Sequence, residues 1–91
     1  MSVKEKQQPI NFDDEKLTNL KKLILYNDDF NTFDFVIETL KEVCGHNAFQ
    51  AETCAWIAHY KGNCVVKKGV YDRLKPCCDQ LSFNNLIVEI Q

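Results

Sequence analysis

The 91-residue sequence has no excess of positive charge and no apolar run long enough to cross a membrane. Its 11 basic and 13 acidic side chains give a net charge of −2. Dedicated nucleic-acid-binding domains are usually basic, so this balance argues against that class. Each uncharged apolar run is far shorter than the ~20 residues of a membrane span. No apolar segment follows the first six residues, so no secretory signal is expected. We therefore expect a cytoplasmic protein that binds neither nucleic acid nor a membrane.

The sequence also lacks a C-x-x-C pair, although it contains five cysteines. An odd number of cysteines without a secretory signal is typical of reduced thiols rather than of a disulfide framework. Recognisable zinc-knuckle and thioredoxin motifs are absent, so we expect neither a metal site nor a cofactor. The adjacent Cys77 and Cys78 could bind a soft metal, but two small, half-buried apolar side chains are the simpler interpretation.

Motifs of the common catalytic classes are missing as well. There is no glycine-rich phosphate loop, no His-x-x-x-His pair and no serine-centred elbow. Cys54 and His59 are five positions apart, so they do not share the helical face that a Cys-His pair within one helix would need. No set of nucleophile, base and oxyanion donors can be assembled, and we expect that the protein is not an enzyme.

The length is that of one domain, because domain sizes are commonest near ~100–150 residues. Residues 1–20 mix charged and polar side chains with scattered apolar ones, without a sustained period, and predict a flexible N-terminal extension. Residues 21–91 are the predicted folded core. Its hydrophobic periodicity predicts strands at 22–26, 64–66 and 86–90, and helices at 33–43, 48–61 and 71–81.

This order, β-α-α-β-α-β, predicts a compact α+β fold in which a small three-stranded sheet packs against three helices that cover one face. Asn31 is the expected N-cap of the first helix, and Asn47 with Gln50 forms an expected capping box at the second. A turn is expected at residues 67–69. Pro76 must lie in the first turns of the third helix or bend it.

Three polar residues, Asn27, Asp28 and Asp29, lie together between the first strand and the first helix. Their acceptor oxygens suit a cation or an amine, although a polar turn that caps backbone N–H groups is the simpler interpretation of the tripeptide alone. His59 shares a helical face with Ala55, and a lone histidine on such a helix is more often packed than functional. Small alanines beside large phenylalanines can leave a cavity next to these groups or can simply form the core.

Two stretches together resemble the signatures of the ClpS family, the adaptors of the ATP-dependent Clp protease. Residues 25–37 (LYNDDFNTFDFVI) are similar to the family's signature at the first strand–helix junction. Residues 59–62 (HYKG) match its second signature at the expected separation. The likeness runs from about residue 22 to residue 90. It implies a fold like the C-terminal domain of a ribosomal stalk protein, in agreement with the predicted order of elements.

The resemblance implies an adaptor that binds proteins through an N-degron, a bulky N-terminal Leu, Phe, Tyr or Trp, and delivers them for degradation. By position in the motifs, Asn27, Asp28 and His59 would receive the free α-amino group. Asp29 and Asn31 would hold the junction and contact the peptide backbone. The side-chain pocket would be lined by Phe33, Ala55, Ala58 and Leu86.

The resemblance also implies a partner, the N-terminal domain of a ClpA- or ClpC-like AAA+ unfoldase. The folded core would dock on this domain, with Asp72 and Lys75 as candidate contacts, and the N-terminal extension would help to transfer the cargo. A monomer suffices for this task. Relatives often have Met at the positions of Phe33 and Ala55, so Ala55 should enlarge the pocket and Phe33 should crowd its rim. Aromatic N-terminal residues are therefore expected to bind at least as well as Leu.

Two alternative functions follow from the residues. One is a redox or metal sensor built on Cys77 and Cys78, which stoichiometric metal or a low thiol pKa would favour. The other is a stalk-like protein-interaction domain without a degron pocket, which an intact fold with no affinity for a free N-terminus would favour.

Overall fold

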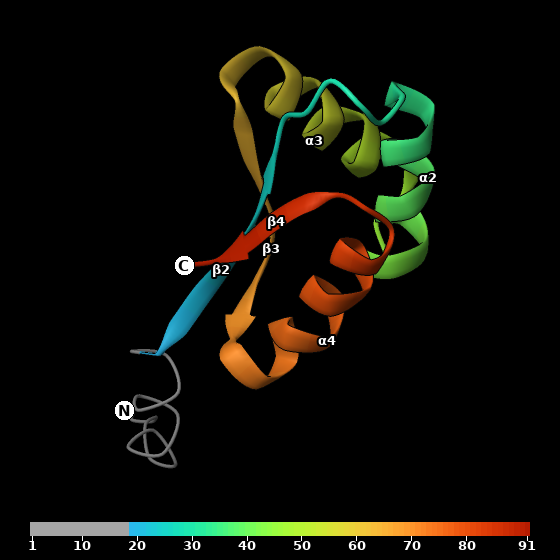
Figure 1. The fold of residues 1–91 in the computed structure, drawn as a ribbon. Coiled ribbons are helices and arrows are strands. Elements are labelled where there is room, and N and C mark those ends of the chain that lie inside the picture. Colours follow the sequence, from blue (N-terminus) through green and yellow to red (C-terminus); the bar gives the residue numbers. More distant parts are fainter. Residues whose placement is uncertain (1–18) are drawn as a thin grey trace, which may run out of the picture.

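The computed structural model describes residues 19–91, which form six elements in the predicted order (Figure 1). The strands are β2 (Leu20–Tyr26), β3 (Asn63–Val70) and β4 (Ile87–Ile90), and the helices are α2 (Phe33–Cys44), α3 (Ala48–Lys61) and α4 (Tyr71–Phe83). The α+β fold with a three-stranded sheet and three helices is confirmed. The predicted extension lies outside the described residues except for Asn19 and Leu20, and Leu20 already belongs to β2. In the described part, no helix is long and apolar enough to span a membrane.

The central strand of the sheet is β2, which pairs antiparallel with β3 on one side and with β4 on the other. All three helices cover one face of this sheet (Figure 1). Alternate side chains of a strand point to the same face, and Leu23 and Leu25 accordingly belong to the core cluster, whereas Ile24 between them does not. The helices contribute fully buried leucines to this core, namely Leu40, Leu74 and Leu81.

Strand β3 extends further than the sequence predicted, and the expected turn at residues 67–69 is wrong. These residues stay paired with β2 as far as Val70, because long-range pairing outweighs the local turn preference of Lys-Lys-Gly. A β-bulge lies within this pair, with Val66 as the extra residue. The imidazole of His46 donates its Nε2–H to the Val66 carbonyl at 2.8 Å, which satisfies an acceptor on the bulged residue.

Helix α2 is capped by Thr32 and not by the predicted Asn31. The Thr32 Oγ1 accepts the N–H of Phe35 at 3.1 Å, and the Thr32 backbone is extended, as an N-cap requires. The side chain of Asn31 is instead oriented by its amide, which donates to the Asp28 carboxylate and to the Asn85 carbonyl.

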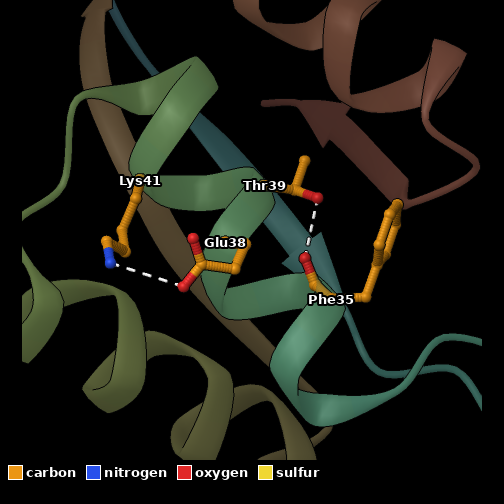
Figure 2. A network of polar contacts seen from close by, with 4 residues as sticks. All are labelled: Phe35, Glu38, Thr39 and Lys41. Atoms are coloured by element: carbon orange, nitrogen blue, oxygen red, sulfur yellow. Dashed lines mark hydrogen bonds and ion pairs between the residues drawn. The ribbon is translucent and has the colours of Figure 1, made fainter.

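Two polar side-chain contacts lie along the body of α2 (Figure 2). Thr39 is only 5% exposed, and its hydroxyl donates to the carbonyl of Phe35 at 2.7 Å. This bond lets a polar residue lie on the buried face without an unsatisfied group. On the exposed face, Lys41 and Glu38 form an ion pair at 3.4 Å, a contact worth ~0.2–0.5 kcal/mol.

Helix α3 begins and ends where the sequence predicted. Asn47 and Gln50 form the reciprocal capping box, with distances of 2.8 and 3.0 Å. Gly62 ends the helix with φ 96°, a left-handed conformation that glycine adopts without steric cost. This turn leads the chain directly into β3.

Helix α4 starts directly after Val70, the last residue of β3, which provides no side-chain cap, and the helix contains Pro76. The proline lies in the second turn, and the helix continues past it to Phe83. Cys77 and Cys78 are half-buried against the core, as the simpler interpretation of this pair predicted. The Cys77 sulfur accepts from Lys67 Nζ at 3.5 Å.

We expect Thr32→Ala to lower the free energy of unfolding by about 1 kcal/mol, because the first turn of α2 loses its side-chain cap. Thr32→Ser keeps the hydroxyl acceptor and should stay close to the parent protein. Urea denaturation followed by circular dichroism measures the difference. Equal stability of the Ala and Ser variants would contradict the assignment of Thr32 as the cap.

Candidate functional site

A backbone hydrogen bond joins the two segments that contain the candidate polar residues. The N–H of Asn27, directly after β2, donates to the carbonyl of Gly62, directly after α3, at 2.9 Å. Beside this bond, Tyr26 and Asn63 are paired across the sheet. The end of β2 is therefore held against the last turn of α3, which carries His59.

The Asp28 carboxylate organises the loop between β2 and α2. Its Oδ1 accepts the N–H of Phe30 at 2.8 Å and the N–H of Asn31 at 2.7 Å, and its Oδ2 accepts from Asn31 Nδ2 at 3.1 Å. A carboxylate has roughly four acceptor sites. Asp28 thus forms the polar turn that was the simpler interpretation, and Oδ2 still has room for one more donor.

These hydrogen bonds stabilise the charged form of Asp28. Burial raises its pKa, but the hydrogen bonds from Asn31 and Phe30 outweigh that effect, so the pKa of Asp28 lies below its usual value. The loop therefore holds a negative charge at neutral pH. Because the pKa is lower in the folded than in the unfolded state, the stabilisation is present above the unfolded value of ~3.9 and is lost as the pH falls through the folded value.

A pocket of about 260 Å³ opens between this loop and helices α2 and α3. Its polar wall consists of Asn27, Asp28, Asp29, Asn31 and His59. Its apolar wall consists of Leu25, Tyr26, Phe33, Val36, Ala55 and Ala58. The structure therefore gathers around one cavity the three residues expected to receive an amine, both junction residues and three of the four expected side-chain contacts.

The fourth expected contact, Leu86, does not line the pocket. It is 4% exposed and belongs to the core cluster. Asn85 before it has a φ of 68°, and the N–H of Leu86 donates to the carbonyl of Leu81, so the chain turns this side chain into the core at the end of α4. The apolar residues that the sequence analysis missed are Leu25, Tyr26 and Val36. Their positions could have predicted these contacts. Leu25 and Tyr26 directly precede the polar tripeptide, and Val36 lies one helical turn after Phe33.

The shape of the pocket follows from small residues on α3 and a large one on α2. Ala55 and Ala58 line the pocket although each is only 4% exposed. Their side chains are short, so they fill little of the space between α3 and the loop. Phe33 is half-buried, and its ring meets the His59 imidazole edge-on with centroids 6.5 Å apart. The pocket thus has an apolar interior beside a polar, negatively charged mouth.

The candidate docking residues, Asp72 and Lys75, lie apart from this pocket. Both are exposed on α4, which begins where β3 pairs with the start of β2, at the opposite end of the sheet from Asn27 (Figure 1). Lys75 forms an ion pair with Asp79 at 2.8 Å, and this hydrogen bond raises the pKa of Lys75.

Three of the five cysteines lack the low thiol pKa that a thiol sensor needs. Burial raises the pKa of Cys44 to about 11 and that of Cys64 to about 12, and it also raises the pKa of Cys78. The thiolate is the reactive form, so these three groups are protonated at neutral pH. Within residues 19–91, no group of three or more His, Cys, Asp or Glu side chains is placed to hold a metal ion.

Comparisons with known proteins point to one family. The family model of the ATP-dependent Clp protease adaptor protein ClpS matches residues 16–85 of the chain. The ATP-dependent Clp protease adapter protein ClpS of Acetivibrio thermocellus is 41% identical over 59 residues, which are 65% of this chain and 60% of the relative. The protein of the same name from Nautilia profundicola is 42% identical over 55 residues, 60% of this chain and 55% of the relative. The matches thus span little more than half the length of these relatives.

A solved structure shares the fold. Agrobacterium tumefaciens ClpS2 bound to L-phenylalaninamide superposes with a TM-score of 0.73, and the superposition covers 80% of this chain and 95% of the other. The two sequences are 23% identical in this comparison. The likeness establishes a common arrangement of helices and strands.

We expect Asn31→Ala to raise the pKa of Asp28 towards its usual value, because the variant removes the donor to Oδ2 while the two backbone donors to Oδ1 remain. Carboxyl carbon shifts followed by NMR over a pH titration measure the change. Asn85→Gly is the matched control, since it keeps both the backbone carbonyl that Asn31 contacts and the positive φ. An Asp28 titration that is the same in the parent protein and in Asn31→Ala would contradict this account of the loop.

Proposed function

Since the chain belongs to the ClpS family of ATP-dependent Clp protease adaptor proteins, we propose that it is a non-catalytic adaptor for proteins with a bulky hydrophobic N-terminal residue. The pocket at the junction of β2, α2 and α3 binds that residue together with its free α-amino group. The adaptor then delivers the protein to a Clp AAA+ unfoldase. The observation that carries this proposal is the single cavity in which a charged carboxylate, an amide and an imidazole border an apolar interior.

The polar mouth suits a protonated amine. An α-ammonium group has three N–H donors and one positive charge, and it finds acceptors in the Asp28 carboxylate, the Asn27 side-chain carbonyl and the His59 imidazole. The Asp28 charge is already held in place by the loop, so little ordering is needed on binding. Acetylation removes both the charge and donors of the ligand. The mouth thereby selects a true chain terminus over an internal residue.

The interior suits one large side chain. Its volume of about 260 Å³ lies just below the ~300–1,000 Å³ of pockets for drug-sized ligands. Ala55 and Ala58 have short side chains that leave the pocket deep enough for a large side chain. Phe33 offers a ring that an aromatic side chain can meet edge-on. The ligand of the structural neighbour, L-phenylalaninamide, combines a free amine with such a side chain. We therefore expect peptides with N-terminal Phe, Tyr or Trp to bind at least as tightly as peptides with N-terminal Leu.

The unfoldase docks on a separate surface. Asp72 and Lys75 lie on α4, away from the pocket, so an unfoldase N-terminal domain bound there leaves the pocket open to cargo. The N-terminal extension, the residues before β2, assists the transfer, and the adaptor works as a monomer. No catalytic group is required, because the chemistry of degradation belongs to the protease.

A fluorescently labelled peptide with a free N-terminal Phe should bind with micromolar or tighter affinity in an anisotropy titration. Its N-acetylated form and the His59→Ala protein should each bind at least about tenfold more weakly, a loss of ~1.4 kcal/mol, because donors or acceptors at the mouth are left unpaired. Lys61→Ala removes an exposed charge at the same end of α3 and serves as the matched control. Equal affinity for the free and acetylated peptides would contradict the proposal.

The double variant Asp72→Ala, Lys75→Ala should weaken binding to the N-terminal domain of a Clp unfoldase while leaving the peptide affinity unchanged. Both are exposed side chains at the far end of the sheet, so their removal does not alter the pocket. Calorimetry with the isolated unfoldase domain and the anisotropy titration provide the two readouts. A double variant that binds the domain as tightly as the parent protein would remove these residues from the docking surface.

A further inference from the structure

Four aromatic rings form one cluster on the outer side of the pocket. Phe33 lies on α2, and Trp56, His59 and Tyr60 lie on α3. The Trp56 ring meets Phe33 edge-on with centroids 4.7 Å apart and meets the His59 imidazole edge-on at 6.2 Å. Tyr60 stacks on Trp56 at 5.1 Å with an interplanar angle of 9°.

Only two of these rings belong to the pocket wall. Phe33 and His59 line the cavity, whereas Trp56 and Tyr60 do not. Trp56 is 45% exposed and is in contact with both lining rings. The helical spacing accounts for this arrangement, because residues three and four positions after Trp56 are its neighbours on the surface of α3. Outside the pocket wall, Trp56 is therefore the ring of the cluster that touches both Phe33 and His59, whereas Tyr60 touches His59 and Trp56.

We propose that Trp56 is a positioning residue that sets the side-chain preference of the pocket, an inference that rests on the proposed function. It holds the Phe33 ring in one orientation and keeps the His59 imidazole beside it, and Tyr60 in turn holds Trp56 by stacking. Trp56 itself does not touch the ligand. Phe33 borders the cavity, so its ring is not packed all round, and its edge-on contact with Trp56 at 4.7 Å is closer than its contact with His59 at 6.5 Å. The contact with Trp56 therefore does most to fix the Phe33 ring.

The consequence differs between aromatic and aliphatic ligands. An aromatic side chain is rigid and gains from an edge-on contact only when the partner ring is held at a favourable angle. A Leu side chain adapts to a displaced wall by changing its rotamer. A fixed Phe33 thus favours N-terminal Phe, Tyr and Trp, and a mobile Phe33 removes this advantage.

Three variants test the proposal in the full chain. Trp56→Leu removes the ring and keeps an apolar side chain, Trp56→Phe keeps an aromatic ring, and Phe49→Leu removes a 76% exposed ring from the same helix outside the cluster. Affinities for peptides with free N-terminal Phe and Leu are measured side by side. Trp56→Leu should weaken the Phe peptide by roughly three- to tenfold and the Leu peptide by less than about twofold. Trp56→Phe should restore most of the Phe preference, and Phe49→Leu should leave it unchanged.

A ratio of Phe to Leu affinity that is the same in Trp56→Leu and in the parent protein would overturn the proposal, and so would an equal change in Phe49→Leu. A ligand-free measurement separates this failure from failure of the proposed function. Three-bond NMR couplings should show one χ1 rotamer for Phe33 in the parent protein and averaged rotamers in Trp56→Leu. If neither peptide binds, the proposed function fails, while Phe33 couplings that are already averaged in the parent protein overturn the positioning role independently.

Discussion

The hydrogen bond from the Asn27 amide to the Gly62 carbonyl is the constraint on which the rest of the site depends. It ties the end of the central strand to the end of α3, two points that are far apart in the sequence. Together with the neighbouring pairing of Tyr26 and Asn63, it fixes the polar loop relative to His59. Gly62 makes the bond possible, because its left-handed conformation ends α3 and sends the chain back along β2.

Within this frame, the polar and apolar halves of the pocket place different demands on the sequence. The polar half needs a fixed negative charge at the surface, and Asp28 supplies it by accepting three hydrogen bonds from its own loop. The apolar half needs space, which the buried methyl groups of Ala55 and Ala58 leave beside Phe33. The proposed ligand, which carries both an amine and a bulky side chain, would contact the two halves together.

Local signals in the sequence were sufficient for the order of elements, the fold class and the limits of α3. Asn47 and Gln50 act within the first turn of this helix, and Gly62 acts directly at its end. Long-range contacts were not predictable in the same way. Asn31 has the local features of an N-cap, yet its side-chain amide donates a hydrogen bond to the carbonyl of Asn85, 54 residues away. Pairing with β2 likewise keeps residues 67–69 in a strand. The place of Leu86 in the core depends on how the chain turns at Asn85, which an apolar pattern does not specify.

The central claim is that a free amine and a bulky side chain bind together in the pocket beside Asn27. The most direct measurement is an NMR titration of the full chain with L-phenylalaninamide, recording backbone amide shifts and ligand-to-protein NOEs. The account predicts shifts at Asn27 and Asp28, and NOEs from the ligand ring to the methyl groups of Ala55, Ala58 and Val36. Shifts confined to α4, or no contact between the ligand ring and these methyl groups, would contradict it.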